Sequence, residues 1–291
     1  MKSSALLFLM MQIGPNPNAG QIEDHADLMQ DRPPREQQLE MDLSRPDPAE
    51  LIGADDNGWL ANCLEMVDTS PARAHVQAHL QRDAHEGAQR AAANYCLGLA
   101  SINLELFEDA LTAFTAARDD TSESELSLRA RFGVMAGNAA LASGRQQHAA
   151  FLLSEAQNDA EAADARRLAA IAAIDHARIL VAQGDTGGAE TRLAAATRLD
   201  PDSSEAWLLS ATLMRRLERL GEAKLHIDQA IALSPADLDI LLESGVIAVL
   251  LVDDETARSR WGEVIALDGA SPQAEAARNY LAQLGEASPT P

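Results

Sequence analysis

The stretch CLGLASINLELFEDALTAF, residues 96–114, decides the fold. It combines bulky residues such as Phe107 and Phe114 with two of the smallest, Gly98 and Ala110, in a pattern that is otherwise helical. A glycine in the interior of a helix costs about 1 kcal/mol relative to alanine. Its presence there indicates a position where two helices approach each other closely.

The alanine of this stretch recurs along the chain, each time just after a turn and at the start of a helix. The spacings between its copies are 39, 40, 34 and 34 residues. Four residues after each alanine stands a bulky residue, and self-similarity of this kind is the signature of a repeat protein. The alanines are Ala110, Ala149, Ala189, Ala223 and Ala257, and the bulky residues are Phe114, Leu153, Leu193, Ile227 and Trp261.

This pattern resembles the tetratricopeptide repeat (TPR) family, whose unit is a helix A, a short turn and a helix B closed by proline. The resemblance covers about residues 91–272, and Pro201 and Pro235 close two of the copies. It implies an all-α fold, a TPR-type α-solenoid of stacked antiparallel helix pairs that winds as a right-handed superhelix. The residues expected to pack the repeats are Gly98, Ala110, Phe114, Gly137, Ala149, Gly184, Ala189, Trp207, Ala223, Gly245, Ala257 and Trp261.

The rest of the chain divides around this array. We expect five TPR-like repeats over residues 91–271, a degenerate leading helix pair over 57–90 and a C-terminal capping helix over 272–285. A cap is needed because an end repeat otherwise exposes its apolar stacking face. Residues 21–56 are rich in proline and acidic residues and lack an apolar period, so they are predicted to be a flexible acidic linker. Residues 286–291 are predicted to be a disordered tail.

The first 20 residues resemble a secretory signal peptide, with Lys2, an apolar run over residues 5–13 and a stretch rich in Gly, Pro and Asn. The run is too short to span a membrane, so no stable membrane insertion is expected. No good Ala-x-Ala site precedes Gln21, which leaves an uncleaved start as the alternative. A cleaved signal would place the protein in the periplasm or outside the cell, and otherwise it would be cytoplasmic.

The chain is strongly acidic, with 45 Asp and Glu residues against 23 Lys and Arg residues and a net charge of −22. Nucleic acid is therefore not expected as a partner, because phosphate binding needs a basic face. Anionic membrane surfaces are disfavoured for the same reason. A composition rich in Ala and Arg and poor in Lys favours a bacterial source.

The sequence contains no recognisable catalytic motif: neither a phosphate-binding loop, a dinucleotide fingerprint, a zinc-protease helix nor a nucleophile elbow. The segment GDTGG, residues 184–188, follows a predicted helix and is interpreted as an A–B turn. His75 and His79 have the spacing of metal ligands but lack a third ligand in register. His176 is expected to be a packed core residue. We therefore predict a protein that is not an enzyme and has no cofactor and no metal.

Cys63 and Cys96 are the two cysteines, and they stand 33 residues apart, about one repeat. In an exported protein they could form a disulfide that joins the leading helix pair to the array. Equivalent residues of stacked repeats point the same way, however, whereas a disulfide needs Cα atoms within ~7 Å. This objection favours two buried free thiols and leaves the disulfide as the alternative.

In the family that this chain resembles, the A helices line a concave groove that holds an extended peptide or a partner helix. Transfer of the helical phase predicts a groove of apolar and Arg side chains, and Arg binds carboxylates through two parallel hydrogen bonds. Solvated Arg, or Arg paired with neighbouring acidic helices, is the competing interpretation. The candidates are Tyr95, Asn103, Arg131, Asn138, Arg178, Arg215 and Arg216, with Leu99, Val134, Ile174, Leu208, Thr212, Leu242, Val246 and Val249 as further lining residues.

Two functions follow from this resemblance. The first is a scaffold that binds a protein or peptide in its concave groove. The alternative is a structural or assembly factor of a periplasmic or envelope complex, which would act through the ends of the solenoid or through the acidic linker.

Overall fold

The computed structural model describes residue 51 and residues 58–286, and this part of the chain consists of helices, turns and short loops without a strand. The helices fall into two compact units, one ending at Pro201 and the other beginning at Asp202. The predicted signal peptide, the linker and the tail lie outside the described residues, apart from Leu51 and Glu286. Leu51 is helical and packs in the core of the first unit, so the linker prediction is wrong at that residue.

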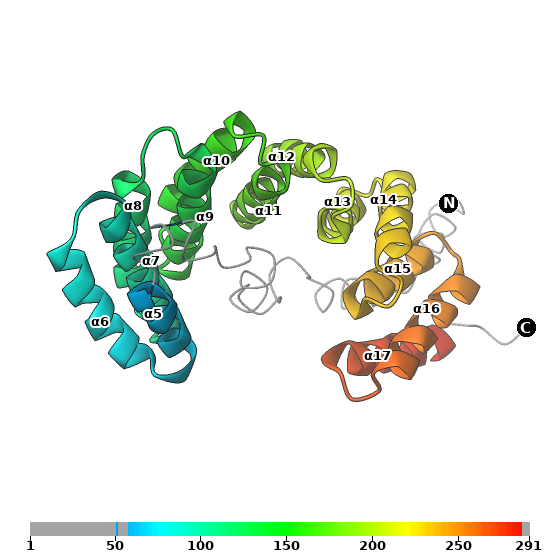
Figure 1. Cartoon of the computed structure of the whole chain (residues 1–291). Coiled ribbons are helices and arrows are strands. Elements are labelled where there is room, and N and C mark those ends of the chain that lie inside the picture. Colours follow the sequence, from blue (N-terminus) through cyan, green and yellow to red (C-terminus); the bar gives the residue numbers. More distant parts are fainter. Residues whose placement is uncertain (1–50, 52–57, 287–291) are drawn as a thin grey trace, which may run out of the picture. The chain divides into compact units, whose positions relative to one another are not determined.

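The first unit contains eight helices within its described part (Figure 1). Consecutive helices pack against one another, and so do the pairs α5–α7 and α9–α11. One continuous core, mostly of small and aliphatic side chains, extends from α5 to α11. The helices are α5 (Gly58–Thr69), α6 (Pro71–Ala84), α7 (Gly87–Asn103), α8 (Phe107–Asp120), α9 (Leu126–Ala142), α10 (Gln146–Ala162), α11 (Arg166–Ala182) and α12 (Thr186–Leu199).

The second unit repeats the same arrangement with A helices shorter than α7, α9 and α11 (Figure 1). Its A helices, α13 and α15, have 13 residues each, whereas α9 and α11 of the first unit have 17. Consecutive helices again pack together, as do α13–α15 and α15–α17. The helices are α13 (Ser204–Arg216), α14 (Leu220–Leu233), α15 (Leu238–Leu250), α16 (Asp254–Leu267) and α17 (Pro272–Glu286).

Five A–B turns share one backbone conformation, which supports the repeat phase predicted from the alanines. Each turn contains one residue with a positive φ. The residue that follows it donates its backbone N–H to the carbonyl five residues earlier, as Leu106 does to Ser101, at 2.8–2.9 Å. This middle residue of the turn has a φ between 58° and 79°, a conformation that closes helices and favours glycine. These middle residues are Glu105, Gly144, Gly184, Glu218 and Val252.

Gly184 is one of these turn residues, so its predicted role in packing the repeats is wrong. A Cβ atom added at Gly184 would meet nothing within 4 Å, whereas its φ is +79°. The glycine is needed for the backbone of the turn and not for a close approach between helices.

Three other predicted glycines do lie at close approaches. A Cβ atom at Gly98 would lie 2.4 Å from the Phe114 ring, and one at Gly245 would lie 2.2 Å from Trp261 Nε1. Gly137 has the same relation to Leu153, at 2.7 Å. The A helix thus lacks a side chain at the position where the bulky residue of helix B contacts its backbone. The other two copies hold Ala177 and Ala211 in this register, and both are fully buried.

The remaining packing residues differ in burial. The five alanines that mark the repeats, Ala110, Ala149, Ala189, Ala223 and Ala257, are all fully buried. Trp261 is also fully buried and packs on Tyr280 of α17, with their ring centroids 5.2 Å apart. Trp207 is only half-buried, and its ring meets His226 edge-on at 5.4 Å.

The handedness of a superhelix is a property of both units taken together. It stays a prediction, as do the boundaries of the five repeats.

Candidate functional site

The predicted groove residues lie on the A helices, and several of them are core residues instead. Tyr95 on α7 is fully buried, and its ring packs on Phe132 of α9 with centroids 5.6 Å apart. Its assignment to a groove is therefore wrong, because α9 covers it. The same correction applies to most of the further lining residues, which are buried: Val134, Ile174, Leu208, Thr212, Leu242, Val246 and Val249.

Arg215 is not a groove residue either. Its Nε donates to Glu243 Oε1 of α15 at 2.7 Å, and both side chains are almost completely buried. Burial and the Glu243 carboxylate raise the pKa of the neighbouring Tyr280 to about 12. The guanidinium of Arg215 therefore balances an internal carboxylate between α13 and α15, and its removal from solvent excludes it from binding a partner. The next residue, Arg216, is partly exposed.

Asn103 is exposed, but its amide has a structural partner. Its Nδ2 donates to the Val67 carbonyl at 2.9 Å, near the end of α5. The last carbonyls of a helix have no partner within the helix, so this bond satisfies one of them. Asn103 thereby ties α7 to the leading helix pair. Leu99, one turn earlier on α7, is partly buried and packs against the core.

Asn138 and Arg178 are brought together by a residue that the sequence did not single out. Asp175 on α11 accepts a hydrogen bond from Asn138 Nδ2 of α9 at 3.0 Å. It also forms an ion pair with Arg178, at 3.0 Å. The Asp175 side chain is only 4% exposed and the Arg178 side chain 14% exposed. Arg131 lies on the same face of α9 as Asn138, two turns earlier, and is partly exposed. We call Arg131, Asn138, Asp175 and Arg178 the A-face cluster.

Cys63 and Cys96 are joined in a disulfide, so the favoured expectation of free thiols is wrong. Their Cα atoms are 6.4 Å apart, within the range that a disulfide needs. The expectation of free thiols rests on equivalent positions for the two residues. Cys63 is the sixth residue of a 12-residue helix and Cys96 the tenth of a 17-residue helix, so they are not equivalent in the structure. Because α5 packs against α7, the two sulfurs can meet.

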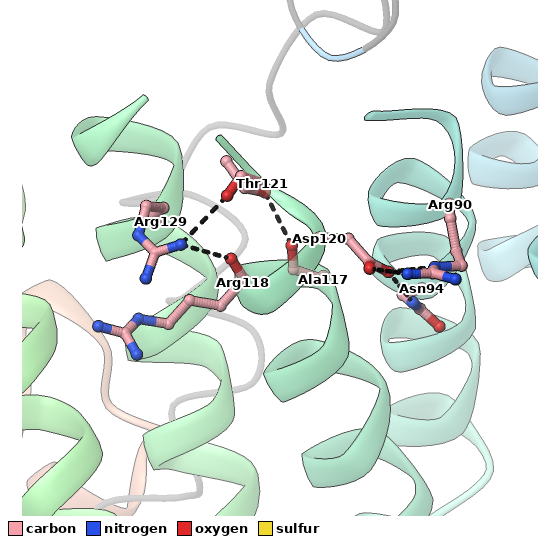
Figure 2. A network of polar contacts seen from close by, with 7 residues as sticks. All are labelled: Arg90, Asn94, Ala117, Arg118, Asp120, Thr121 and Arg129. Carbon is pink, nitrogen blue, oxygen red and sulfur yellow. Dashed lines mark hydrogen bonds and ion pairs between the residues drawn. The ribbon is translucent and has the colours of Figure 1, made fainter. Parts of the chain in front are cut away.

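A second polar network holds the end of α8 between its neighbours (Figure 2). Arg129 at the start of α9 donates to the carbonyls of Arg118 and Thr121, each at 3.1 Å. On the other side, Arg90 and Asn94 of α7 both donate to Asp120. The Arg129 bonds satisfy backbone carbonyls at the end of α8, and the bonds to the Asp120 carboxylate join α8 to α7.

Comparison with known proteins gives the fold a name. No family model and no curated protein matches the sequence. Among solved structures, PilF of Pseudomonas aeruginosa superposes with a TM-score of 0.61 at 16% identity, covering 78% of this chain and 96% of PilF. PilW, described as a type IV pilus biogenesis factor, gives a TM-score of 0.61 at 16% identity, covering 78% of this chain and 100% of PilW.

A tetratricopeptide repeat protein from Parabacteroides merdae superposes with a TM-score of 0.55 at 13% identity, covering 68% of this chain and 75% of that one. The chain has the tetratricopeptide-repeat fold. Identities this low carry the likeness of fold and no more.

In this TPR fold, one register of the A helix faces the preceding A helix. Cys96, Asp175 and Glu243 each stand fourteen residues before the alanine of their copy. Cys96 bonds to Cys63 of α5, Asp175 accepts from Asn138 of α9, and Glu243 accepts from Arg215 of α13. A buried acid at a fixed distance from the repeat alanine is a signal that the sequence already contains.

The described part of the TPR chain holds neither a metal-binding cluster nor a membrane-spanning helix. The described helices include none that is both long and apolar enough to cross a membrane. No group of three or more His, Cys, Asp or Glu side chains in residues 58–286 could hold a metal ion. Burial and the nearby Arg192 charge lower the pKa of His176 to about 4, so this histidine is a neutral core residue at pH 7.

Proposed function

We propose that this TPR chain is a non-enzymatic scaffold that binds a protein or peptide on the A-helix face of its first unit. The observation that carries the proposal is the A-face cluster, in which predicted binding residues of α9 and α11 share one face. TPR folds are in general protein-interaction scaffolds, which supports the same conclusion.

The cluster has the chemistry of a preorganised polar recognition site. Asp175 holds the Asn138 amide and the Arg178 guanidinium in fixed positions. Side chains that are already ordered lose less conformational entropy when a partner binds. Guanidinium groups favour planar acceptors, so we propose a partner segment that presents a carboxylate or backbone carbonyls to Arg131 and Arg178.

Site-specific photocrosslinking in the native host tests this proposal. A photoreactive phenylalanine in place of Arg131 should crosslink a partner of defined mass, whereas one in place of Arg258 on the B helix α16 should not. Arg178→Gln should weaken capture because it removes the ion pair with Asp175 and the guanidinium together. Crosslinks formed only from B-helix positions would contradict the proposed face.

A second candidate is an assembly factor of a periplasmic or envelope complex that acts through the ends of the array or the acidic linker. The Cys63–Cys96 disulfide favours it, because disulfides persist in oxidising compartments such as the periplasm. PilW, described as a type IV pilus biogenesis factor, shares the fold, and we propose an assembly role here by analogy with it. We infer from the disulfide that the chain works outside the cytoplasm.

One measurement tests the proposed location, and another separates the two candidates. Thiol trapping in intact cells, followed by a non-reducing gel, should show Cys63 and Cys96 fully oxidised if the chain is exported. Replacement of Arg131 and Arg178 should abolish partner capture by a face binder and leave it unchanged for a factor that acts through its ends. Reduced cysteines in the native host would overturn the proposed location.

A further inference from the structure

A groove of about 660 Å³ lies between α6 and α8, away from the A-face cluster on α9 and α11. Leu97 and Asn94 of α7 form its base, since both are almost completely buried yet line it. Ala84, Ala113 and Ala116 add small apolar walls. Its size is within the range of ligand-binding pockets, about 300–1,000 Å³. Figure 2 shows Arg90, Asn94 and Asp120, three of the lining residues, pointing toward one another.

The charges that line this groove do not cancel. Arg82 pairs with Asp83 at 2.9 Å, and Arg90 pairs with Asp120, so both guanidinium groups are neutralised internally. Three further lining carboxylates, Glu86, Asp109 and Asp119, are exposed and form no ion pair with other described residues. The groove therefore carries a net negative charge of three, with its histidines counted as neutral.

An apolar strip borders the groove on α6. Val76 and Leu80 are 60% and 67% exposed, unusually open for large apolar residues. They lie on the same helical face as His79 and Asp83, which line the groove, because residues three, four and seven apart share a face. The surface therefore presents exposed apolar side chains next to a negatively charged groove.

We propose that the α6–α8 groove binds a cationic amphipathic segment of a partner protein. Its Lys or Arg side chains would pair with Glu86, Asp109 and Asp119, and its apolar side chains would cover Val76 and Leu80. Charge complementarity selects this occupant, since the acidic rim repels acidic peptides, nucleic acids and anionic lipid surfaces. The site lies on different helices from the A-face cluster, so each site is tested without the other.

A fluorescein-labelled 14-residue peptide of Leu and Lys, with Leu at helical spacing, is the probe. Its binding to the full chain is measured by fluorescence anisotropy at pH 7.5 in 0.15 M salt. The triple variant Glu86→Gln, Asp109→Asn, Asp119→Asn should weaken binding about tenfold, as expected for three lost surface ion pairs. The matched control is Glu123→Gln, Glu255→Gln, Glu275→Gln, which removes three exposed carboxylates elsewhere and changes the net charge equally.

The apolar half of the site is tested separately. Val76→Ser with Leu80→Ser should weaken the Leu/Lys peptide several-fold and leave an oligolysine peptide unaffected. Circular dichroism melting of every variant checks that the helices remain folded. Equal weakening by the two triple variants, tight binding of a peptide with Glu in place of Lys, or no measurable binding would each overturn the proposal.

Discussion

The indole of Trp261 lies directly on the backbone of α15, and its Nε1 donates to the Leu242 carbonyl at 3.2 Å. Gly245 makes this contact possible because it has no Cβ atom. Gly98 does the same for Phe114 in the stretch that identified the fold. At these positions the loss of helix propensity is offset by closer packing of a large side chain.

Gly245→Ala should lower the free energy of unfolding by about 1–3 kcal/mol, since the new Cβ atom would overlap the Trp261 ring. Gly262→Ala on α16 is the matched control. No atom lies within 4 Å of its added Cβ, so it should stabilise by about 0.5–1 kcal/mol. Urea unfolding of both variants measures the difference. A stabilising Gly245→Ala would show that the packing inference is wrong.

His176 makes the stability of the first unit depend on pH. Its folded pKa of about 4 lies below the ordinary value of 6.5, so the unfolded chain takes up its proton first as the pH falls. The neutral His176 therefore contributes to the free energy of unfolding in full above pH 6.5, and this contribution is lost progressively between pH 6.5 and 4. The loss should be roughly 1–2 kcal/mol after allowance for solvent screening.

His176→Leu should remove this part of the pH dependence. The variant should therefore gain stability relative to the original chain as the pH is lowered from 7 to 4.5, measured by urea unfolding at each pH. A constant difference between the two proteins across that range would show that His176 does not titrate as inferred.

At the scale of the helices, a polar pair or a disulfide joins successive A helices at one register. The pairs differ in chemistry: a disulfide between α5 and α7, an amide and a carboxylate between α9 and α11, and an ion pair between α13 and α15. Within each unit the A helices pack against the B helices next to them in sequence, and α5–α7, α9–α11 and α13–α15 also pack as pairs of A helices. Few A-helix side chains therefore reach solvent, which is why the transferred groove phase selected core residues such as Tyr95.

Arg215→Met alone should cost about 3–5 kcal/mol, because it leaves Glu243 charged and buried without its partner. The double variant Arg215→Met, Glu243→Leu removes both charges and should cost far less. Thermal unfolding of Arg215→Met, of Glu243→Leu and of the double variant completes a double-mutant cycle, which measures the interaction between the two side chains. Additive losses would indicate that the two side chains do not act as a pair.

At the scale of the whole molecule, the disulfide fastens the start of the helical array over residues 58–286. Cys63 and Cys96 close a loop of 33 residues that contains α6, the second half of α5 and the first half of α7. In a repeat protein each element is stabilised mainly by its neighbours, so such a bond acts locally. The leading pair gains most, since it has a neighbour on one side within the described array.

Refolding the chain in reducing agent should destabilise this region by about 3–4 kcal/mol, from the loop-closure entropy of a bond of this span. Hydrogen exchange should accelerate in α5 and α6 and stay unchanged in α9 and α10. Cys63→Ala with Cys96→Ala serves as the control, because reductant should not alter it further. Identical exchange in the oxidised and reduced chains would contradict this role.

The sequence by itself determined the helices, their order and, apart from Gly184, the residues at close approaches, because these depend on local periodicity and on the size of single side chains. The tertiary structure decided which A-helix side chains are buried, which cysteines and charges meet, and where a groove opens between α6 and α8. Those features join residues such as Asn138 and Asp175, 37 positions apart, or Arg215 and Glu243, 28 apart. Their contacts depend on the distance and rotation between packed helices, which the repeat period alone does not specify.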